Sequence, residues 1–281
     1  MLQARLVKEG SLRLLEGEHR AKRKLGQNFL IDPNVARKIV GLLHVQPGDQ
    51  VLEIGPGRGA LSSVLLQSGA QVVGVEKDLH LAGELKKLWP GMHVVAADAL
   101  DISWSGLPEA GIHKIIGNLP YNVASPLIWD IVALCPEAES MVFTIQKEVG
   151  LRLTASPGTK AYGALSVWVQ SFAHPRLEFV VGPHVFRPRP QVDSAVVSLV
   201  PLSQGPGPQE RAALIALLRV CFQQRRKQLK TSLRDMWSDG VQSWFAAHNM
   251  SPKARAEELT PKQFLSLAQV IAAGGDRQEF R

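Results

Sequence analysis

The sequence reads Val51-Leu52-Glu53-Ile54-Gly55-Pro56-Gly57-Arg58-Gly59 at its most diagnostic point. The apolar residues from Gln50 to Ile54 predict a strand, the glycines predict a loop that a ligand can approach closely, and the stretch from Ala60 to Gln67 predicts a helix. This order is the beginning of a βαβ unit. Further β-like and helical segments alternate as far as about Phe179, so we expect an α/β fold with a doubly wound sheet. The β-branched run from Val192 to Val200 indicates a last strand, antiparallel and at the sheet edge.

The glycine loop alone does not identify its ligand. Gly55, Gly57 and Ala60 also fit the fingerprint of dinucleotide-binding proteins. Glu53 favours a different ligand, because a carboxylate beside the loop would repel a pyrophosphate but attract the sulfonium and ammonium groups of S-adenosylmethionine. The alternative is that Glu53 pairs with Arg58 and that the glycines only form a tight turn.

A second motif, Asn118-Leu119-Pro120-Tyr121, follows a short apolar strand, at the sheet edge where open α/β folds bind ligands. The exocyclic amine of adenine is a poor nucleophile until hydrogen bonds orient its lone pair, and the Asn118 side-chain oxygen and the Leu119 carbonyl are suitable acceptors. Pro120 fixes the turn, and Tyr121 offers an aromatic face on which a base can stack. Taken alone, the motif is equally typical of an ordinary strand-to-turn junction. After the glycine loop, it predicts methylation of an amino group.

Three further residues extend this interpretation. Glu76 ends the next predicted strand, where its carboxylate can accept hydrogen bonds from ribose hydroxyls. Asp98 follows the apolar run from Met92 to Ala97 and can accept from an adenine amine, although it could equally be a helix N-cap. Phe186 precedes two prolines that keep the chain extended, so its ring could face a base from the side opposite Tyr121; otherwise it is a core residue.

These motifs occur in the same order in the ribosomal small-subunit RNA adenine dimethyltransferases, the kasugamycin-sensitivity family, which this chain resembles over nearly its whole length. Further matching stretches are residues 25–30, 146–149, 162–163, 186–194 and 224–227. The resemblance implies a Rossmann-like, seven-stranded class I methyltransferase sheet with a smaller all-α C-terminal domain, and S-adenosylmethionine as the cofactor. It also implies N6,N6-dimethylation of two adjacent adenosines in the 3'-terminal hairpin loop of 16S rRNA, with a role in 30S biogenesis.

The resemblance assigns residues to two roles. The catalytic residues would be Asn118, Leu119, Pro120, Tyr121 and Phe186. The cofactor-binding residues would be Gln27, Asn28, Leu30, Glu53, Gly55, Gly57, Glu76, Lys77, Asp98, Ala99 and Asn118.

Two other functions compete with this one. The antibiotic-resistance methyltransferases dimethylate an adenine of large-subunit RNA by the same chemistry, but Leu119 and the basic stretch at 224–227 favour the small-subunit enzymes. A non-catalytic assembly or transcription factor could keep the fold and bind nucleic acid without turnover. The intact Asn118, Tyr121 and Glu76 argue against that loss of activity.

The charge balance indicates RNA as the partner, because the chain carries a formal +7 and has a pI of about 9.6, and phosphates attract such a surface. Near the C-terminus, apolar residues recur at helical spacing, and basic residues occupy another face. The apolar set is Leu218, Phe222, Leu229, Leu233 and Trp237. The alternative is a solvated basic face. The predicted RNA contacts are Arg20, Lys22, Arg23, Lys24, Arg187, Arg189, Arg225, Arg226, Lys227, Lys230 and Arg234.

The composition is 45% hydrophobic over 281 residues, enough for two domains. The stretch from Pro201 to Pro208 is the best linker, so we expect an N-terminal extension at 1–20, a methyltransferase domain at 21–204 and a helical domain at 205–281. Neither a secretory nor an organellar leader is indicated, which suggests a cytoplasmic enzyme, and we expect a monomer. The eight histidines show no paired ligand spacing, so no metal site is expected. Cys135 and Cys221 fall in apolar helical patterns typical of buried thiols.

Overall fold

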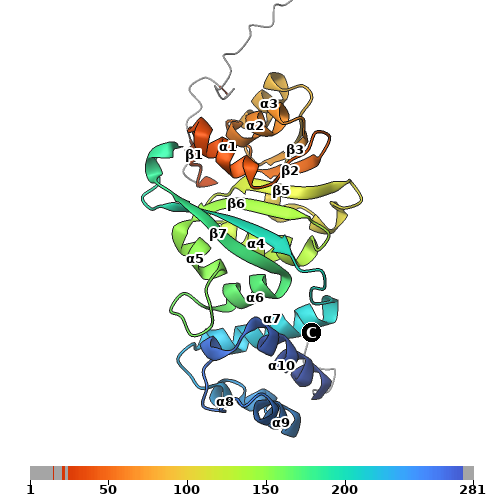
Figure 1. Ribbon diagram of the computed structural model, residues 1–281, viewed down its shortest axis with the longest axis vertical. Helices are drawn as coiled ribbons and strands as arrows, with labels where there is room; N and C mark the ends of the chain where they lie inside the picture. Colours follow the sequence, from red (N-terminus) through yellow and green to blue (C-terminus); the bar gives the residue numbers. More distant parts are fainter. Residues whose placement is uncertain (1–14, 16–20, 23–24, 275–281) are drawn as a thin grey trace, which may run out of the picture. The chain divides into compact units, whose positions relative to one another are not determined.

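The structure is a computed structural model that describes residue 15, residues 21–22 and residues 25–274. The chain divides into two compact units. The first contains the residues up to 128 together with 137–150 and 176–200, and the second contains 129–136, 151–175 and the residues from 201 onward. Figure 1 labels the helices and strands of both. The predicted domain boundary near residue 205 follows the last strand and stays a prediction.

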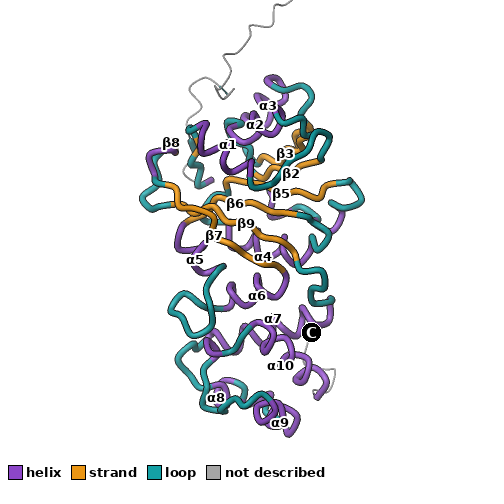
Figure 2. Tube along the Cα trace, viewed as in Figure 1, coloured by secondary structure: helices purple, strands orange, loops and turns teal. Residues whose placement is uncertain are grey.

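The first unit is built around a seven-stranded sheet in the order β4-β3-β2-β5-β6-β9-β7 (Figures 1 and 2). Strands β2 to β6 pair in parallel, and β9 runs antiparallel to β6. The strands are β2 Gln50–Ile54, β3 Gln71–Glu76, β4 His93–Ala96, β5 Ile112–Asn118, β6 Ser140–Gln146, β7 Ala173–Val181 and β9 Ser194–Pro201. The predicted doubly wound, seven-stranded sheet is therefore confirmed.

Three helices, α1 (Pro33–Gly41), α2 (Ala60–Gln67) and α3 (Leu79–Leu88), pack on one face of this sheet. Helix α1 begins where the Asp32 carboxylate accepts hydrogen bonds from the first free backbone N–H groups, and Pro33 supplies the preset φ of the first turn. Its apolar side includes Ile39, which is fully buried in the core against α2 and the sheet. Burial of one such side chain contributes about 1.5–3 kcal/mol. The next helices are α4 Ala124–Leu134, α5 Lys147–Leu153 and α6 Ala164–Phe172.

One expectation for the sheet is wrong. Strand β9 is antiparallel, as predicted, but it lies between β6 and β7 rather than at the edge. The physical reason is backbone hydrogen bonding: Ala195, Val196 and Val197 are fully buried, so the N–H and C=O groups on both edges of β9 need partners from a neighbouring strand. The edge position belongs to β7, most of whose residues are partly or fully exposed.

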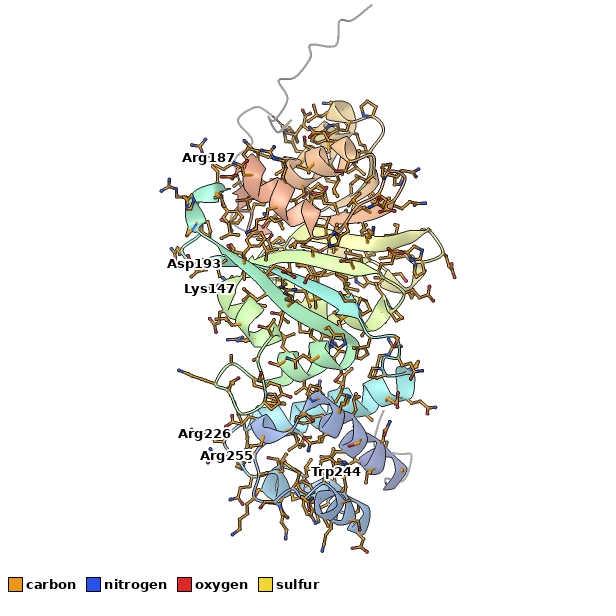
Figure 3. All side chains as sticks on the ribbon, viewed as in Figure 1. Lys147, Arg187, Asp193, Arg226, Trp244 and Arg255 are labelled. Atoms are coloured by element: carbon orange, nitrogen blue, oxygen red, sulfur yellow. The ribbon has the colours of Figure 1, made fainter. Side chains whose placement is uncertain are left out.

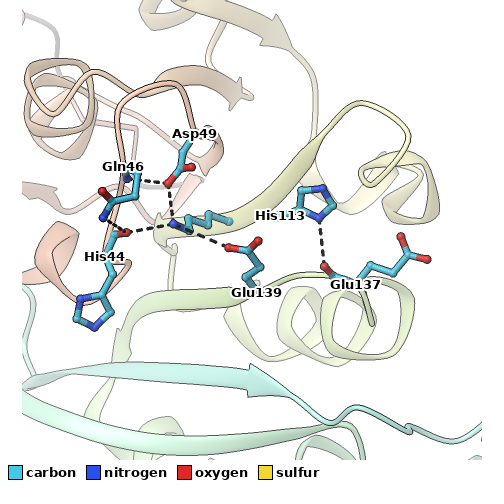
Figure 4. Close-up of polar contacts among 7 residues, drawn as sticks. His44, Gln46, Asp49, His113, Glu137 and Glu139 are labelled. Atoms are coloured by element: carbon cyan, nitrogen blue, oxygen red, sulfur yellow. Dashed lines mark hydrogen bonds and ion pairs between the residues drawn. The ribbon is translucent and has the colours of Figure 1, made fainter.

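A buried lysine lies near the amino end of β5, and Figure 4 shows its polar contacts. The Lys114 Nζ donates to the His44 carbonyl at 3.1 Å and to the Asp49 carboxylate at 2.6 Å. The Asp49 carboxylate also accepts from the Gln46 backbone N–H, and these two bonds lower the pKa of Asp49. Because the ammonium donates to two oxygen atoms and lies 3.9 Å from the Glu139 carboxylate, we assign it a structural role, far from the carboxyl ends of the strands.

The second unit is helical, with α7 (Pro208–Gln223), α8 (Leu229–Ser232), α9 (Asp239–Ala247) and α10 (Pro261–Gly274). The Trp129 and Trp168 rings stack at 4.2 Å, and the Trp168 indole donates to the Trp129 carbonyl at 2.8 Å. The Tyr162 hydroxyl donates to the Leu259 carbonyl at 2.8 Å. These bonds satisfy the polar atoms of large buried rings. No helix among the described residues is long and apolar enough to cross a membrane.

The apolar and basic residues predicted on two faces of one helical run come instead from separate elements. Helix α7 ends at Gln223, and α8 begins only at Leu229. The chain leaves the helix because the Leu229 backbone N–H donates to the Ala254 carbonyl and Gln228 forms a bridge with Arg255. These long-range bonds replace the local i to i−4 bonds.

Candidate active site

A cavity lies at the carboxyl ends of β2 to β5, the edge at which open α/β sheets bind ligands. Most of the residues that the sequence assigned to the cofactor and to catalysis line it. They are Gln27, Asn28, Gly55, Gly57, Glu76, Lys77, Asp98, Ala99, Asn118, Leu119, Pro120 and Tyr121. Residues from the predicted glycine loop, from the ends of β3, β4 and β5 and from the segment before β1 (Phe29–Leu30) therefore meet in one place.

Asn118 ends β5, and its amide has a defined orientation. The side-chain Nδ2 donates to the Asn28 backbone carbonyl at 2.8 Å. A carbonyl only accepts, so the nitrogen must face Asn28 and the Oδ1 atom must face the other way. Oδ1 makes no hydrogen bond with any residue in the described part of the chain. The turn is also fixed to the neighbouring strand, because the Leu119 backbone N–H donates to the Thr144 carbonyl at 3.0 Å.

Residues 25–29 cover this cavity, and the segment is held at both ends. At one end the Asp78 carboxylate accepts from Lys22 at 3.0 Å and from Gln27 at 3.3 Å. At the other end, Leu30 of β1 pairs antiparallel with Phe186 of β8 (Phe186–Arg187). We call Lys22 and residues 25–30 together the strap.

Gly26 allows the strap to lie against Pro120 and Asn122 in the turn after β5. Its φ is +62°, and a Cβ atom there would lie 2.7 Å from the Asn122 Oδ1. A larger residue would therefore be strained by the positive φ, and the Asn122 side chain would have to move.

Glu76 is 5% exposed. One carboxylate oxygen accepts from the Gly57 backbone N–H and the other from the Asp78 backbone N–H, each at 2.9 Å. Burial raises the pKa of Glu76, and the two backbone bonds oppose that rise. The carboxylate has four acceptor positions, more than the backbone donors around it, so a position remains for the hydroxyl groups of a ligand.

Glu53 is 1% exposed and lies in a smaller cavity that shares Gly55, Gly57 and Asn118 with the first. Its hydrogen-bond donor is the Ser62 hydroxyl, at 2.6 Å, rather than the Arg58 of the alternative interpretation. Burial raises the pKa of Glu53 to about 7, against the effect of the Ser62 bond, and the nearby Glu76 charge adds to the rise. No cation among the described residues hydrogen-bonds to Glu53, and a buried carboxylate in this setting favours a positively charged ligand.

Asp98 is an N-cap residue, as the alternative interpretation expected, and its role towards an adenine amine stays a prediction. Its carboxylate accepts from the Leu100 backbone N–H and caps the 3₁₀ helix Ala99–Asp101. It also forms an ion pair with Lys77, and this bond lowers the pKa of Asp98. The same side chain lines the main cavity.

The cavity fits S-adenosylmethionine in chemistry. At Gly55, φ is +65° and an added Cβ atom would have no neighbour within 4 Å. The glycine backbone therefore borders open space in the cavity. Glu53 and Glu76 are buried carboxylates whose pKa values are raised. A ligand with hydroxyl donors and positive charge compensates both, and a pyrophosphate does not.

Three predicted site residues do not line the main cavity, and one of them is Glu53, described above. Leu30 is buried and lines only the smaller one. Phe186 lines neither cavity, is 2% exposed and belongs to the hydrophobic core beside Leu30 and Val185. Its expected position opposite Tyr121 is therefore not seen here, and the core alternative describes where the ring lies.

Tyr121 is half-buried, and its hydroxyl lies 2.7 Å from the Ser194 hydroxyl. Burial raises the pKa of Tyr121. The neighbouring Asp193 pairs with Lys147 at 3.2 Å (Figure 3). Sequence reasoning gave Ser194 no role, although it lies in a matched stretch, because a contact from the end of β5 to the start of β9 leaves no local pattern.

The predicted RNA contacts differ in environment. Arg20, Arg23 and Lys24 lie outside the described residues, and Lys22 is paired with Asp78. Arg187 and Arg189 are exposed on and after β8.

In the second unit, Arg226, Lys227, Lys230 and Arg234 are exposed, and Arg234 pairs with the adjacent Asp235. Arg225 instead donates to the Glu257 carboxylate at 2.7 Å and to the Lys160 and Thr159 carbonyls at 2.8 and 3.0 Å. It therefore stabilises the unit internally.

Sequence reasoning gave no role to Arg255, an exposed basic residue of this unit. Arg255 lies near Arg226 (Figure 3), because the bridge between Gln228 and Arg255 joins the two segments. The sequence separation of these segments hides this proximity.

Comparisons with known proteins agree with this geometry. Residues 18–273 match the family model described as ribosomal RNA adenine dimethylase. The chain is 49% identical to the ribosomal RNA small subunit methyltransferase A of Oleidesulfovibrio alaskensis, over 90% of this chain and 91% of that protein. It is 40% identical to the protein of the same name from Acidithiobacillus ferrooxidans, over 93% and 98%.

Two solved structures share the fold. A dimethyladenosine transferase from Plasmodium falciparum is 25% identical with a TM-score of 0.70, covering 85% of this chain and 95% of that one. The 23S rRNA methyltransferase ErmE is 24% identical with a TM-score of 0.67, covering 87% and 99%.

Proposed function

The chain belongs to the ribosomal RNA adenine dimethylase family, and on that premise we propose that it methylates N6 of two adjacent adenosines in the 3'-terminal hairpin loop of 16S rRNA. S-adenosylmethionine is the methyl donor, and N6,N6-dimethyladenosine is the product. The reaction belongs to 30S biogenesis in the cytoplasm, and the protein acts as a monomer. Relatives named as small-subunit methyltransferases, at 40–49% identity, support the choice of the small subunit.

The observation that carries the proposal is the orientation of the Asn118 amide. Its Nδ2 is bound to the Asn28 carbonyl at 2.8 Å, so Oδ1 is available to accept a hydrogen bond from an exocyclic amine. The Leu119 carbonyl is the second acceptor, in a turn that its own backbone N–H ties to β6. Two acceptors at the amine draw the nitrogen towards tetrahedral geometry and point its lone pair away from the protein bonds.

The cofactor is assigned to the residues that line the two cavities. Glu76 accepts from the ribose hydroxyls with its remaining acceptor positions, and Asp98 accepts from the adenine amine. Glu53 provides negative charge from the smaller cavity for the cationic end of the molecule. The strap covers the ligand and excludes water, and Gly55 and Gly57 allow close approach.

Catalysis on this proposal consists mainly of positioning. S-adenosylmethionine, when bound, supplies a methyl group on a sulfonium that leaves as a neutral thioether. Asn118 and Leu119 hold the amine, and Tyr121 stacks on the adenine ring from the half-buried position at the end of the turn. N6 loses one proton for each methyl group that it gains, and the acidity of the amine rises as the new bond forms, so water suffices as the proton acceptor.

RNA binding is assigned to exposed cations. Arg187 lies in β8, the strand that pairs with the strap, and Arg189 follows it, whereas Arg226, Lys227 and Lys230 are exposed in the second unit. Phosphate neutralisation by such residues supplies affinity that does not depend on base sequence. The domain division at residue 205 assigns this second group to the helical domain.

The experiment that tests the proposal uses labelled S-adenosylmethionine with 30S and 50S particles from a strain that lacks the modification. We expect label only in the small-subunit RNA, at two adjacent adenosines, and mass spectrometry of nuclease digests should identify dimethyladenosine. Label in the 50S particle alone would assign the enzyme to the large-subunit class. Binding of 30S particles without any transfer would indicate a non-catalytic assembly factor.

A further inference from the structure

The sheet topology brings one residue of an antiparallel strand to the active-site edge. The parallel strands β2 to β6 end at this edge, whereas β9 begins there, because it runs antiparallel to β6. Ser194, the first residue of β9, pairs in register with Gln146, the last residue of β6. It is fully buried, so its hydroxyl needs a protein partner.

That partner is the Tyr121 hydroxyl, 2.7 Å from the Ser194 Oγ. Tyr121 follows Pro120 in the turn after β5, lines the main cavity and is only half-buried, and its hydroxyl is bonded to the sheet. The Lys147 backbone N–H donates to the Asp193 carbonyl at 3.0 Å and fixes the residue before Ser194. The hydrogen bond therefore connects the turn after β5 to a rigid part of β9.

We propose that Ser194 is a positioning residue that fixes the plane of the Tyr121 ring for the target base. The inference rests on the proposed function, in which Tyr121 stacks on adenine. A tyrosine ring held only at Cβ can rotate about two side-chain bonds, and a bond to its hydroxyl removes that freedom before the base arrives. Ser194 itself does not touch the base.

The two methylations depend on this bond to different degrees. Adenine has two N–H bonds to donate to Asn118 and Leu119, but monomethyladenine has one. The second methylation therefore relies more on the stacking face for the pose of the base. Loss of the tether should slow the second step more than the first, so monomethyladenosine should accumulate.

The first test observes the free protein. The chain contains two tyrosines, and Tyr162, whose hydroxyl donates to the Leu259 carbonyl, is a built-in control. With tyrosine labelled with ¹³C at Cζ, Ser194→Ala should move the Tyr121 resonance and leave that of Tyr162 in place, and Tyr121→Phe assigns the signals. An unchanged Tyr121 resonance in Ser194→Ala would overturn the tether.

The second test is a double-mutant cycle under single-turnover conditions with 30S particles. Ser194→Ala and Tyr121→Phe should each slow the second methylation by about threefold to tenfold, the scale of one neutral hydrogen bond. The double variant should be no slower than either single variant, because both remove the same bond. Additive effects would overturn the inference. If Ser194→Ala does not fold, Tyr121→Phe decides alone, and wild-type rates for both methylations in that variant would overturn it.

Tyr121→Ala separates this inference from the proposed function. If Tyr121→Ala is strongly impaired while Tyr121→Phe and Ser194→Ala are not, the ring matters and the tether does not, so only the Ser194 inference fails. If Tyr121→Ala also methylates at the wild-type rate, the stacking role assigned to Tyr121 fails, and the Ser194 inference fails with it.

Discussion

At the residue scale, Glu53 links the stability of the protein to pH. Burial raises the pKa of Glu53 from 4.5 to about 7. The folded protein then holds a proton that the unfolded chain releases, so stability falls as the pH rises from about 4.5 and the loss is complete above about 7. A group with a raised acid pKa thus penalises the folded state at high pH.

The prediction from Glu53 concerns the difference in pH-dependent stability between wild type and Glu53→Gln. Wild type should lose about 2 to 3 kcal/mol more stability than Glu53→Gln between pH 5 and pH 8, because only wild type carries the titrating group. Urea unfolding at both pH values measures this difference, and the titrating groups that do not interact with Glu53 cancel in the comparison. Parallel stability curves for the two proteins would show that Glu53 does not titrate in this range.

Asn118 should affect the chemical step more than binding. Asn118→Ala removes the acceptor that matters most as N6 becomes tetrahedral, so the single-turnover rate should fall by roughly 10²-fold or more, with RNA affinity nearly unchanged. Asn118→Asp is the matched variant: it keeps the size but places a carboxylate against the Asn28 carbonyl, where the amide nitrogen donates at 2.8 Å. It should also lose activity. Full activity in either variant would exclude the assigned role.

Glu76 should affect the cofactor. Glu76→Gln keeps the size of a buried side chain that two backbone N–H groups hold in place, but it replaces one acceptor oxygen by a donor. We expect S-adenosylmethionine to bind more weakly by about 1 to 3 kcal/mol, the scale of a hydrogen bond to a charged group. Calorimetric titration measures it, with RNA affinity as the control. Unchanged cofactor affinity in a folded variant would place the ribose elsewhere.

These residues divide into those that sequence could assign and those that it could not. Asn118 and Glu76 were predictable because the end of an apolar strand can be recognised locally in the sequence. The carboxyl ends of parallel strands then all lie at one edge of the sheet. Lys22 pairs with Asp78, and Arg225 with Glu257, across long stretches of chain. No spacing rule reveals such a partner, so both were expected to contact RNA. Phe186 was ambiguous for the same reason, because an aromatic residue before prolines fits a core as well as a site.

At the element scale, the strap is fastened by Asp78, the N-cap residue of α3. Lys22 contributes to this anchor without lining the cavity, so it can be changed without removing a cofactor contact. Lys22→Ala should make residues 25–30 exchange backbone hydrogen faster and should weaken cofactor binding by about threefold, since the lysine is half-exposed and such pairs contribute modestly. Hydrogen exchange with mass spectrometry measures the first effect, and calorimetry measures the second.

Lys87→Ala is the matched control for the strap. It removes a surface ion pair with Glu84 on the same helix and leaves the strap alone. Equal effects of the two substitutions on cofactor affinity would mean that surface charge, and not the anchor, was responsible.

The elements themselves were predictable where their signals were local. The bounds of β2 and α2 agree with the apolar run and the helical stretch on either side of the glycine loop. The position of β9 inside the sheet was not predictable, because strand order depends on which neighbours bury an apolar strand. The separation of α7 from α8 likewise depends on backbone bonds to residues 254 and 255.

At the scale of the whole molecule, the excess of basic residues governs the encounter with RNA. The formal charge is +7, and binding to a polyanion releases counterions, so affinity should fall steeply with salt. Lys227 and Lys230 are exposed in the second unit, whereas Arg225 is engaged by Glu257. The exposed lysines should therefore carry part of this dependence.

The double variant Lys227→Gln with Lys230→Gln should show a shallower dependence of log affinity on log salt. The magnitude of the slope should fall by roughly 1 to 2, because each phosphate contact contributes about 0.7 to 0.9 to it. Filter binding of 16S rRNA fragments at several salt concentrations measures the slope. Lys86→Gln with Lys87→Gln removes the same charge from exposed positions on α3 and controls for net charge. Cofactor affinity should not change in either pair. If both pairs reduce the slope equally, the second unit provides only a solvated basic face, and RNA binding depends on net charge rather than on these lysines.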